Sequence, residues 1–157
     1  MEITLRKAVL DDSRALAALI RGIGWFHRFD AEDLETTAAR IAAHLGLCLG
    51  DDSHDVWLAE DPQGRLLGYV AVHWLPYLIL KGPEGYISEL FVEEAARGQG
   101  VGQRLLTVVR EEGVRRGCSR LSLINFRQRE SYERGFYRKA GWSERETGAN
   151  FVLSLMD

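Results

Sequence analysis

The chain has 157 residues, of which 46% are hydrophobic and 27% are charged, and its formal net charge is −3 at pH 7. These values are typical of one soluble globular domain over residues 1–157, and they argue against a general nucleic-acid binder or a protein of the membrane surface. Cys48 and Cys118 are far apart without metal-type spacing, so we expect reduced thiols in a cytoplasmic protein and no metal site.

The first third of the chain predicts one strand and two helices. Residues 3–9 alternate in part between apolar and polar side chains, as a strand does. The Asp11-Asp12-Ser13 segment offers N-cap residues for a helix over 14–23. A second helix is expected over 31–45 with Asp30 as its cap, because apolar side chains recur there at helical spacing.

The middle of the chain predicts a β-hairpin. Residues 56–60 and 66–75 are apolar and rich in β-branched and aromatic side chains, which favours strands. Asp61-Pro62-Gln63-Gly64 lies between them, where proline presets φ and glycine accepts a left-handed conformation. We therefore expect two antiparallel neighbours.

The second half of the chain alternates between strands and helices. Strands are expected over 86–92 and 121–125, and helices over 101–114 and 130–140, the latter ended by a glycine. Residues 142–145 and 151–155 would form a closing hairpin. This order predicts an α/β fold with a mixed sheet that is covered by helices on both faces.

A glycine-rich turn, Arg97-Gly98-Gln99-Gly100-Val101-Gly102, separates the 86–92 strand from the 101–114 helix. Unpaired N–H groups and the positive end of the helix dipole meet at such a turn, so it favours a diphosphate. A dinucleotide fold would space its glycines as Gly-x-Gly-x-x-Gly and end the next strand on an acid, whereas this strand ends at Asn125. The chain has no Gly-Lys dipeptide for a P-loop either. Coenzyme A is the remaining nucleotide-like cofactor.

Three segments in order resemble the GCN5-related N-acetyltransferase (GNAT) family. Leu90-Phe91-Val92 followed by Arg97 to Gly102 is similar to its acyl-CoA signature, and Phe136 to Trp142 is similar to its Phe-Tyr-x-x-x-Gly-aromatic segment. Leu5-Arg6-Lys7-Ala8 with Asp11 gives a weaker match to its first strand and helix start. The resemblance implies a mostly antiparallel mixed sheet with one splayed parallel pair.

The resemblance also implies acetyl-CoA as cofactor. The family rests the pyrophosphate on the amides of the glycine-rich turn and pairs the pantetheine arm with the edge of the preceding strand, in the manner of strand addition. Asn125 would lie at the mouth of the splay. The expected cofactor-binding residues are Leu90, Phe91, Val92, Arg97, Gly98, Gln99, Gly100, Val101, Gly102 and Asn125.

The implied reaction is attack of a neutral amine on the acetyl thioester. Tyr137 matches the family's tyrosine general acid, and Tyr132 is a rival that lacks the surrounding motif. Glu89 is the expected base, although some family members carry the carboxylate one position earlier, where this chain has Ser88. Glu84 at the start of the strand and a water chain are the alternatives. Simple alternation would place Ile87, Glu89 and Phe91 on one face, unless the strand contains a bulge.

Two aromatic connections, residues 24–29 and 74–80, match the places where the family binds its acceptor. The expected substrate-binding residues are Trp25, Phe26, His27, Trp74 and Tyr77. His73 is expected to be a hydrogen-bonded sheet residue. We expect a small-molecule or peptide amine as substrate, no nucleic-acid or membrane partner, and a possible homodimer. The alternatives are an acyl-CoA sensor without turnover and an acetyltransferase of protein lysines or N-termini.

Overall fold

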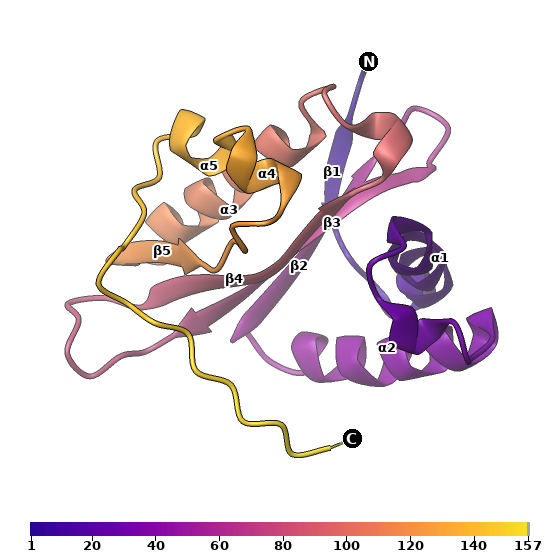
Figure 1. Ribbon diagram of the computed structural model, residues 1–157, viewed down its shortest axis with the longest axis horizontal. Helices are drawn as coiled ribbons and strands as arrows, with labels where there is room; N and C mark the ends of the chain where they lie inside the picture. Colours follow the sequence, from indigo (N-terminus) through magenta and orange to yellow (C-terminus); the bar gives the residue numbers. More distant parts are fainter. Residues whose placement is uncertain (157) are drawn as a thin grey trace. The chain divides into compact units, whose positions relative to one another are not determined.

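A computed structural model describes residues 1–156 (Figure 1). The chain divides into two compact units, one of residues Met1–Ile124 and a second that begins at Asn125. None of the helices in the described residues is long and apolar enough to cross a membrane.

The first unit is built on a five-stranded sheet in the order β1-β2-β3-β4-β5. The strands are β1 (Thr4–Lys7), β2 (His54–Glu60), β3 (Leu66–Leu75), β4 (Glu84–Val92) and β5 (Arg120–Leu123). Every neighbouring pair is antiparallel except β4 and β5, which run parallel. The predicted mixed, mostly antiparallel sheet is confirmed.

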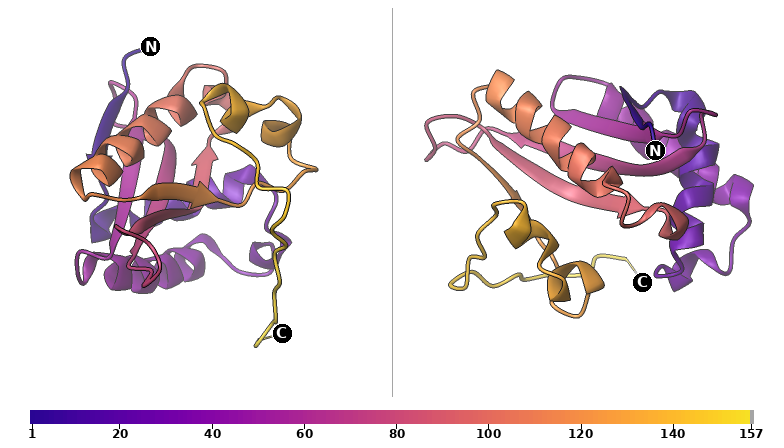
Figure 2. Two further views of the ribbon diagram at one scale, coloured as in Figure 1. Left: turned by 90° about the vertical axis from the view of Figure 1, so that its left-hand side faces the viewer. Right: turned by 90° about the horizontal axis from the view of Figure 1, so that it is seen from above.

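Helices cover both faces of this sheet, as predicted. They are α1 (Ser13–Ile23), α2 (Leu34–Leu49) and α3 (Val101–Arg115). In both figures α1 and α2 lie on one side of the strands and α3 lies on the other (Figures 1 and 2). α3 connects β4 to β5, because parallel neighbours need such a crossover.

The α1–α2 face of the sheet holds an apolar core. Leu16 of α1 and Leu45 of α2 pack on Leu58 of β2 and on Tyr69 and Ala71 of β3, and all five are buried. Side chains alternate along β3, so Val70 and Val72 point to the α3 face, where both are also buried. Because directly paired residues of neighbouring strands share a face, a β4 residue lies on the same face as the β3 residue opposite it.

Two expected helix starts differ from the structure. α2 begins at Leu34 rather than residue 31, and its cap is Asp33, whose carboxylate accepts the Thr36 N–H at 2.8 Å, rather than Asp30. Before α1, the Asp12 carboxylate accepts hydrogen bonds from Arg6 and from the Val9 N–H, so it caps no N–H of α1 itself.

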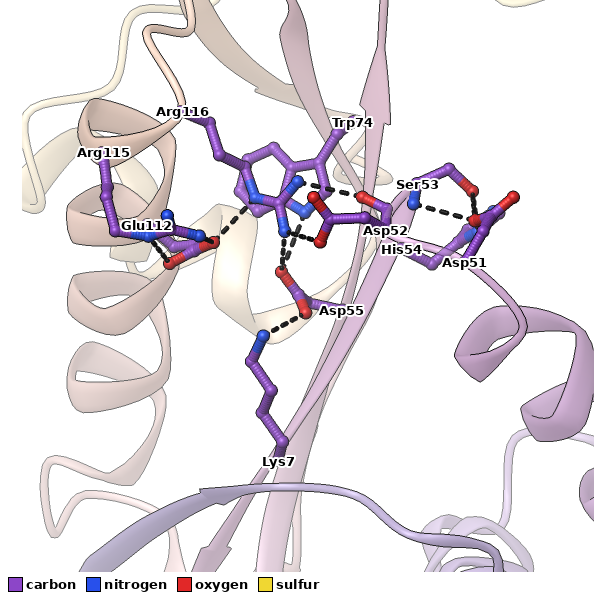
Figure 3. Close-up of polar contacts among 10 residues, drawn as sticks. All are labelled: Lys7, Asp51, Asp52, Ser53, His54, Asp55, Trp74, Glu112, Arg115 and Arg116. Carbon is purple, nitrogen blue, oxygen red and sulfur yellow. Dashed lines mark hydrogen bonds and ion pairs between the residues drawn. The ribbon is translucent and has the colours of Figure 1, made fainter.

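A buried cluster of charges joins three strands to α3 (Figure 3). Asp55 of β2 is 5% exposed, and its carboxylate binds Lys7 of β1 at 2.7 Å, Arg116 at 3.3 Å and the indole N–H of Trp74 at 2.9 Å. The Arg116 guanidinium also lies 4.9 Å from the centroid of the Trp74 ring and binds Glu112 at 2.7 Å. Asp55 is thus a structural carboxylate on the α3 face.

The hairpin of β2 and β3 follows the expectation. The two strands are antiparallel, and Gly64 in the intervening turn has φ of 78°. The Gly64 N–H donates to the carbonyl of Asp61 at 2.9 Å, while the Asp61 carboxylate accepts the Arg65 N–H. Glycine is needed here because other residues pay for a left-handed backbone.

The second unit differs from two expectations. The helix predicted over 130–140 is two short helices, α4 (Glu130–Glu133) and α5 (Phe136–Lys139), separated at Gly135 with φ of 65°. The predicted hairpin of residues 142–145 and 151–155 is wrong, because neither segment is a strand. Apolar residues alternate in both segments, but the described residues from 125 on contain no strand that could pair with their backbone N–H and C=O groups.

Candidate functional site

β4 departs from regular pairing on both of its edges at Ser88. Toward β3, Glu89 lies opposite Ala71 and Ile87 lies opposite Val72, so Ser88 is one extra residue, a β-bulge. Toward β5, the register ends where Ile87 meets Leu123. Residues 88–92 of β4 consequently present one edge that β5 does not pair.

The bulge decides which side chains face α1 and α2. Glu89 and Phe91 lie opposite Ala71 and Tyr69, which belong to the core beneath those helices. Ile87 lies opposite Val72 and is on the α3 face. The expectation from simple alternation that Ile87 shares a face with Glu89 is wrong, because the inserted residue reverses the facing on either side of it.

Glu89 is accessible to solvent, yet nearby protein atoms strip water from its carboxyl group. This desolvation raises the pKa of Glu89, while His44 of α2 and the Tyr69 hydroxyl oppose the rise. Tyr69 is 3% exposed, its hydroxyl has no hydrogen-bond partner of ordinary geometry, and burial followed by the Glu89 charge raises its pKa well above the usual value. A carboxylate with a raised pKa next to an unpartnered hydroxyl is typical of a functional site.

An aromatic cluster lies beside Glu89 on the same face. It consists of Trp25, Phe26, Tyr69 and Phe91. The Phe91 ring lies 5.9 Å from Trp25, 5.5 Å from Phe26 and 5.9 Å from Tyr69, with the first two contacts edge-on. Trp25 and Phe26 come from the connection between α1 and α2, so the structure brings these two expected acceptor residues to the strand of Glu89.

The glycine-rich turn leads from β4 into α3. Gly98 and Gly100 have φ of 73° and 84°, and Gly100 is the residue before the helix. A Cβ built on either glycine would meet no atom within 4 Å, so it would enter open space above the turn. The first N–H groups of α3 have no partner within the helix. The turn therefore offers backbone donors to an anion in space that only glycine leaves free.

Side chains of the turn fold back onto the protein. The Arg97 Nε donates to the carbonyl of Val92 at 3.3 Å, and its guanidinium lies 5.9 Å from the centroid of the Trp25 ring. Gln99 donates its amide N–H to the carbonyl of Ala95 at 2.9 Å. The Nε of Arg97 and the side-chain amide of Gln99 are thus bonded to the backbone, as is the Arg97 N–H, which donates to the carbonyl of Glu94 at 3.2 Å.

Other expected residues lie elsewhere. Trp74 is buried on the α3 face with its N–H on Asp55, so it is not a candidate for the acceptor site. Glu84 is 4% exposed and its carboxylate forms an ion pair with Arg120, so Glu84 as the base stays a prediction. Tyr77 is exposed on the loop before β4, and His27 is exposed with its Nδ1 3.4 Å from Asp30.

The second unit carries Tyr137, Tyr132 and Asn125. Burial raises the pKa of Tyr137 to about 12, and its ring packs edge-on against Phe136 at 5.0 Å. The Tyr132 hydroxyl instead binds the Glu144 carboxylate at 3.0 Å. Asn125 accepts a hydrogen bond from Ser131 at 3.0 Å. Tyr137 as the acid and Asn125 as a cofactor contact stay predictions.

Sequence reasoning missed Tyr69 and His44 as neighbours of Glu89. Both are isolated residues in apolar segments, and no motif marks them. Only strand register and the packing of α2 bring them to the same carboxylate.

Comparisons with known proteins agree with this geometry. The sequence profile of the acetyltransferase (GNAT) family matches residues 19–142. An acetyltransferase of Agrobacterium fabrum is 36% identical over 80 residues, which are 50% of this chain and 51% of that protein. A thialysine N-epsilon-acetyltransferase of Bos taurus is 32% identical over 63 residues, 40% of this chain and 37% of that protein. The matched parts therefore span about half or less of these two curated relatives.

A crystal structure of a transcriptional regulator from Bacillus halodurans shares the fold with a TM-score of 0.84 at 22% identity, over 97% of this chain and 100% of that one. The family profile covers well over half of the chain and includes β4, the glycine-rich turn and α3. The chain belongs to the acetyltransferase (GNAT) family.

Proposed function

We propose that the protein is an N-acetyltransferase that transfers the acetyl group of acetyl-CoA to a primary amine. The observation that carries this proposal is the free edge of β4, which runs from Ser88 through Val92 toward the glycine-rich turn and has Glu89 beside it. An edge with unpaired backbone groups followed by an anion site suits a ligand that is peptide-like at one end and a diphosphate at the other.

The residues present fit this cofactor. The backbone of Leu90, Phe91 and Val92 would pair with the pantetheine arm, and the amides of the turn would bind the pyrophosphate where Gly98 and Gly100 leave open space. Bound acetyl-CoA would supply a thioester whose carbonyl carbon accepts the amine. We also propose that residues 1–157 act as one functional domain.

Glu89 is the carboxylate that we propose for the acceptor amine. A lysine-like ammonium has a pKa of about 10.4, so making it neutral at pH 7 costs roughly 4.6 kcal/mol. Glu89 attracts the ammonium and can receive its proton, directly or through a relay, and desolvation raises the pKa of Glu89 toward that of a useful base. This carboxylate lies on the β4 segment that we expect to bind the cofactor.

Tyr137 is the proposed donor to the leaving sulfur. Its pKa of about 12 keeps the hydroxyl protonated at neutral pH. A thiol has a pKa near 8.5, which is about 3.5 pKa units below that of Tyr137, so complete transfer of the tyrosine proton to a free thiolate would be unfavourable. Tyr137 is therefore expected to stabilise the developing thiolate by donating a hydrogen bond.

The acceptor is proposed to be a small-molecule or peptide amine with an apolar or aromatic group. The aromatic cluster next to Glu89 supports this class, because rings pack well against apolar substituents and against a desolvated cation. The thialysine acetyltransferase among the relatives acts, by its name, on an amine. Protein lysines and N-termini remain the second acceptor class, and a sensor without turnover is the alternative of a different kind.

Calorimetry with CoA and acetyl-CoA, followed by an acetylation screen, tests the proposal. The screen would offer polyamines, amino acids, aromatic amines, aminoglycosides and peptides, with thiol release and mass spectrometry as readouts. Binding of CoA with acetylation of at least one amine supports it. Binding without thiol release from any amine supports the sensor, and absence of binding contradicts both.

We also propose a homodimer and a cytoplasmic location. Phe151, Leu153 and Leu155 alternate in an extended segment and are 84–91% exposed, while β5 ends the sheet. Pairing of this segment with β5 of a second copy would cover both. Light scattering should report a dimer that Leu153→Asp dissociates and Leu47→Asp, an exposed leucine on α2, does not. A monomeric wild type contradicts the dimer.

The cytoplasmic location is supported by the two cysteines, which are both free, as thiols are in a reducing compartment.

A further inference from the structure

A row of polar side chains crosses β2, β3 and β4 on the face that carries Glu89. It consists of Asp51, Ser53, His54, His73 and Ser88. The row starts at Asp51, which is exposed, and ends at Ser88 in the β4 bulge. His54 and His73 are half-buried in the sheet, where polar side chains need hydrogen-bond partners, and the proposed function so far uses neither of them.

The last link of the row lies at the site itself. The Nε2 of His73 is 2.7 Å from Oγ of Ser88. Ser88 is exposed, and it is the residue at which β4 leaves both its regular register with β3 and its pairing with β5. Its hydroxyl is therefore at the start of the free β4 edge and adjacent in sequence to Glu89.

Hydrogen-bond donors and acceptors set the state of the second histidine. The Ser53 hydroxyl donates its only proton to Asp51, so its oxygen accepts from Nδ1 of His54, at 2.7 Å. Neutral His54 consequently keeps Nε2 as an acceptor. His54 and His73 are directly opposite each other, and their rings meet edge-on at 4.6 Å. Figure 3 shows the contacts of Ser53 with Asp51 beside His54.

We propose that Ser88 and His73 form a proton relay that takes the proton from the acceptor amine, with Glu89 holding the ammonium by charge. This inference rests on the proposed acetyltransferase function. It assigns His73 a role that acts through Ser88, so His73 is a positioning and relay residue rather than a group that touches the substrate.

The relay moves two protons and leaves Ser88 unchanged. The ammonium gives one proton to Oγ of Ser88 while Ser88 gives its own proton to Nε2 of His73. The products are a neutral amine, an unchanged serine and a His73 imidazolium. The imidazolium returns the proton to solvent before the next cycle. The step therefore requires that Nε2 of His73 be unprotonated at rest and that the Ser88 hydroxyl donate to it.

The surroundings of His73 keep it neutral. Burial, followed by the neighbouring His54, lowers the pKa of His73 below 6.5. Other titratable groups on this face include Tyr86, whose ring is 6.3 Å from His73, and Glu89 with its neighbours Tyr69, His44 and Cys48. A histidine that is neutral at pH 7 can accept a proton.

The tautomer of His73 tests the resting geometry without any turnover. Long-range 15N–1H NMR spectra of the full chain distinguish a proton on Nδ1 from one on Nε2. We expect Nδ1–H for His73, and Ser88→Ala should change its Nε2 resonance. A resting proton on Nε2, or a resonance indifferent to Ser88→Ala, overturns the relay even if the acetyltransferase activity is absent.

The pH dependence of kcat/KM tests the relay in catalysis, using an amine from the screen. The rate should fall as pH drops through the pKa of His73. His54→Gln removes a cause of the lowered pKa, so this acidic limb should move to higher pH. Glu35→Gln, an exposed carboxylate that pairs with Arg14 on the helices, is the matched control and should leave the limb in place.

Substitutions at the relay complete the test. Ser88→Ala and His73→Gln should each lower kcat about 10²-fold, the range that general base catalysis provides. Glutamine keeps an amide near the position of Nε2, so a merely structural hydrogen bond would survive in His73→Gln and kcat would stay near wild type. That result, or an acidic limb that ignores His54→Gln and vanishes in Glu89→Gln, overturns the proposal.

Discussion

Substitution of Gly100 by leucine separates the conformational role of this residue from its role in binding. Gly100 has φ of 84°, where an L-residue costs roughly 1–2 kcal/mol. A Cβ at this position meets no protein atom within 4 Å, so no steric clash adds to that cost. The leucine side chain would instead occupy the open space that we assign to the pyrophosphate. We expect a modest loss of stability together with loss of CoA binding.

Gly64 in the β2–β3 turn provides a matched control. Its φ is 78°, and a Cβ there also meets nothing within 4 Å, but the turn lies outside the proposed site. Gly64→Leu should therefore lose the same 1–2 kcal/mol of unfolding free energy, roughly 2–8 °C in Tm for a chain of this size, and keep its affinity for CoA. The pair of variants isolates ligand binding from backbone strain.

A thermal melt with and without CoA measures both quantities. A ligand at 100 times its Kd stabilises the fold by roughly 2.7 kcal/mol, which corresponds to a Tm rise of about 5–11 °C. Wild type and Gly64→Leu should show this rise and Gly100→Leu should not. If Gly100→Leu binds CoA as tightly as Gly64→Leu does, the open space above the turn is not where the pyrophosphate lies, and the reasoning fails.

Three further predictions concern other residues. Tyr137→Phe should lower kcat about 10²-fold in steady-state assays, whereas Tyr132→Phe should not, since that hydroxyl is bound to Glu144; equal losses would contradict the assignment of the acid. Asp55→Asn should cost about 3 kcal/mol in urea unfolding, because Lys7 and Arg116 would lose their buried counter-charge; a cost near zero would show that water compensates. Arg115 and Arg116 lower the pKa of Glu112 to about 2 from 4.5, so its contribution to stability is present above pH 4.5 and is lost as pH falls toward 2; unfolding curves of Glu112→Gln should lack that part of the acid dependence.

The elements of the first unit could be predicted from the sequence where local signals agreed with packing. The hairpin of β2 and β3 has apolar strands and a turn whose proline and glycine both favour its geometry, and it formed as expected. α3 likewise begins at Val101, directly after the glycine-rich turn. In these segments each local preference pointed to the final structure.

The predictions that failed depend on interactions between distant residues. Trp74 could not be recognised as the partner of Asp55, because that contact requires the register of β2 and β3. Asp12 could not be recognised as the partner of Arg6, because that contact depends on how the chain turns from β1 into α1. The C-terminal hairpin had the right alternation, but strands also need a neighbour for their hydrogen bonds. The glycine-rich motif was enough to place β4 and the turn. The face of the sheet on which Glu89 lies could be known only once the structure showed the bulge at Ser88.

Because of the bulge at Ser88, the number of residues in β4 decides which face of the sheet each of its side chains occupies, whatever the residue type. Deleting this one residue would restore regular pairing between β3 and β4. Because side chains alternate with a period of two, the side chains on one side of the deletion would then move to the opposite face: either Glu89 and Phe91, or the β4 residues up to Ile87. No atom of the glycine-rich turn would need to change. An insertion or deletion at this position would therefore change which β4 side chains face the acceptor. The same backbone edge of β4 would stay available to the cofactor.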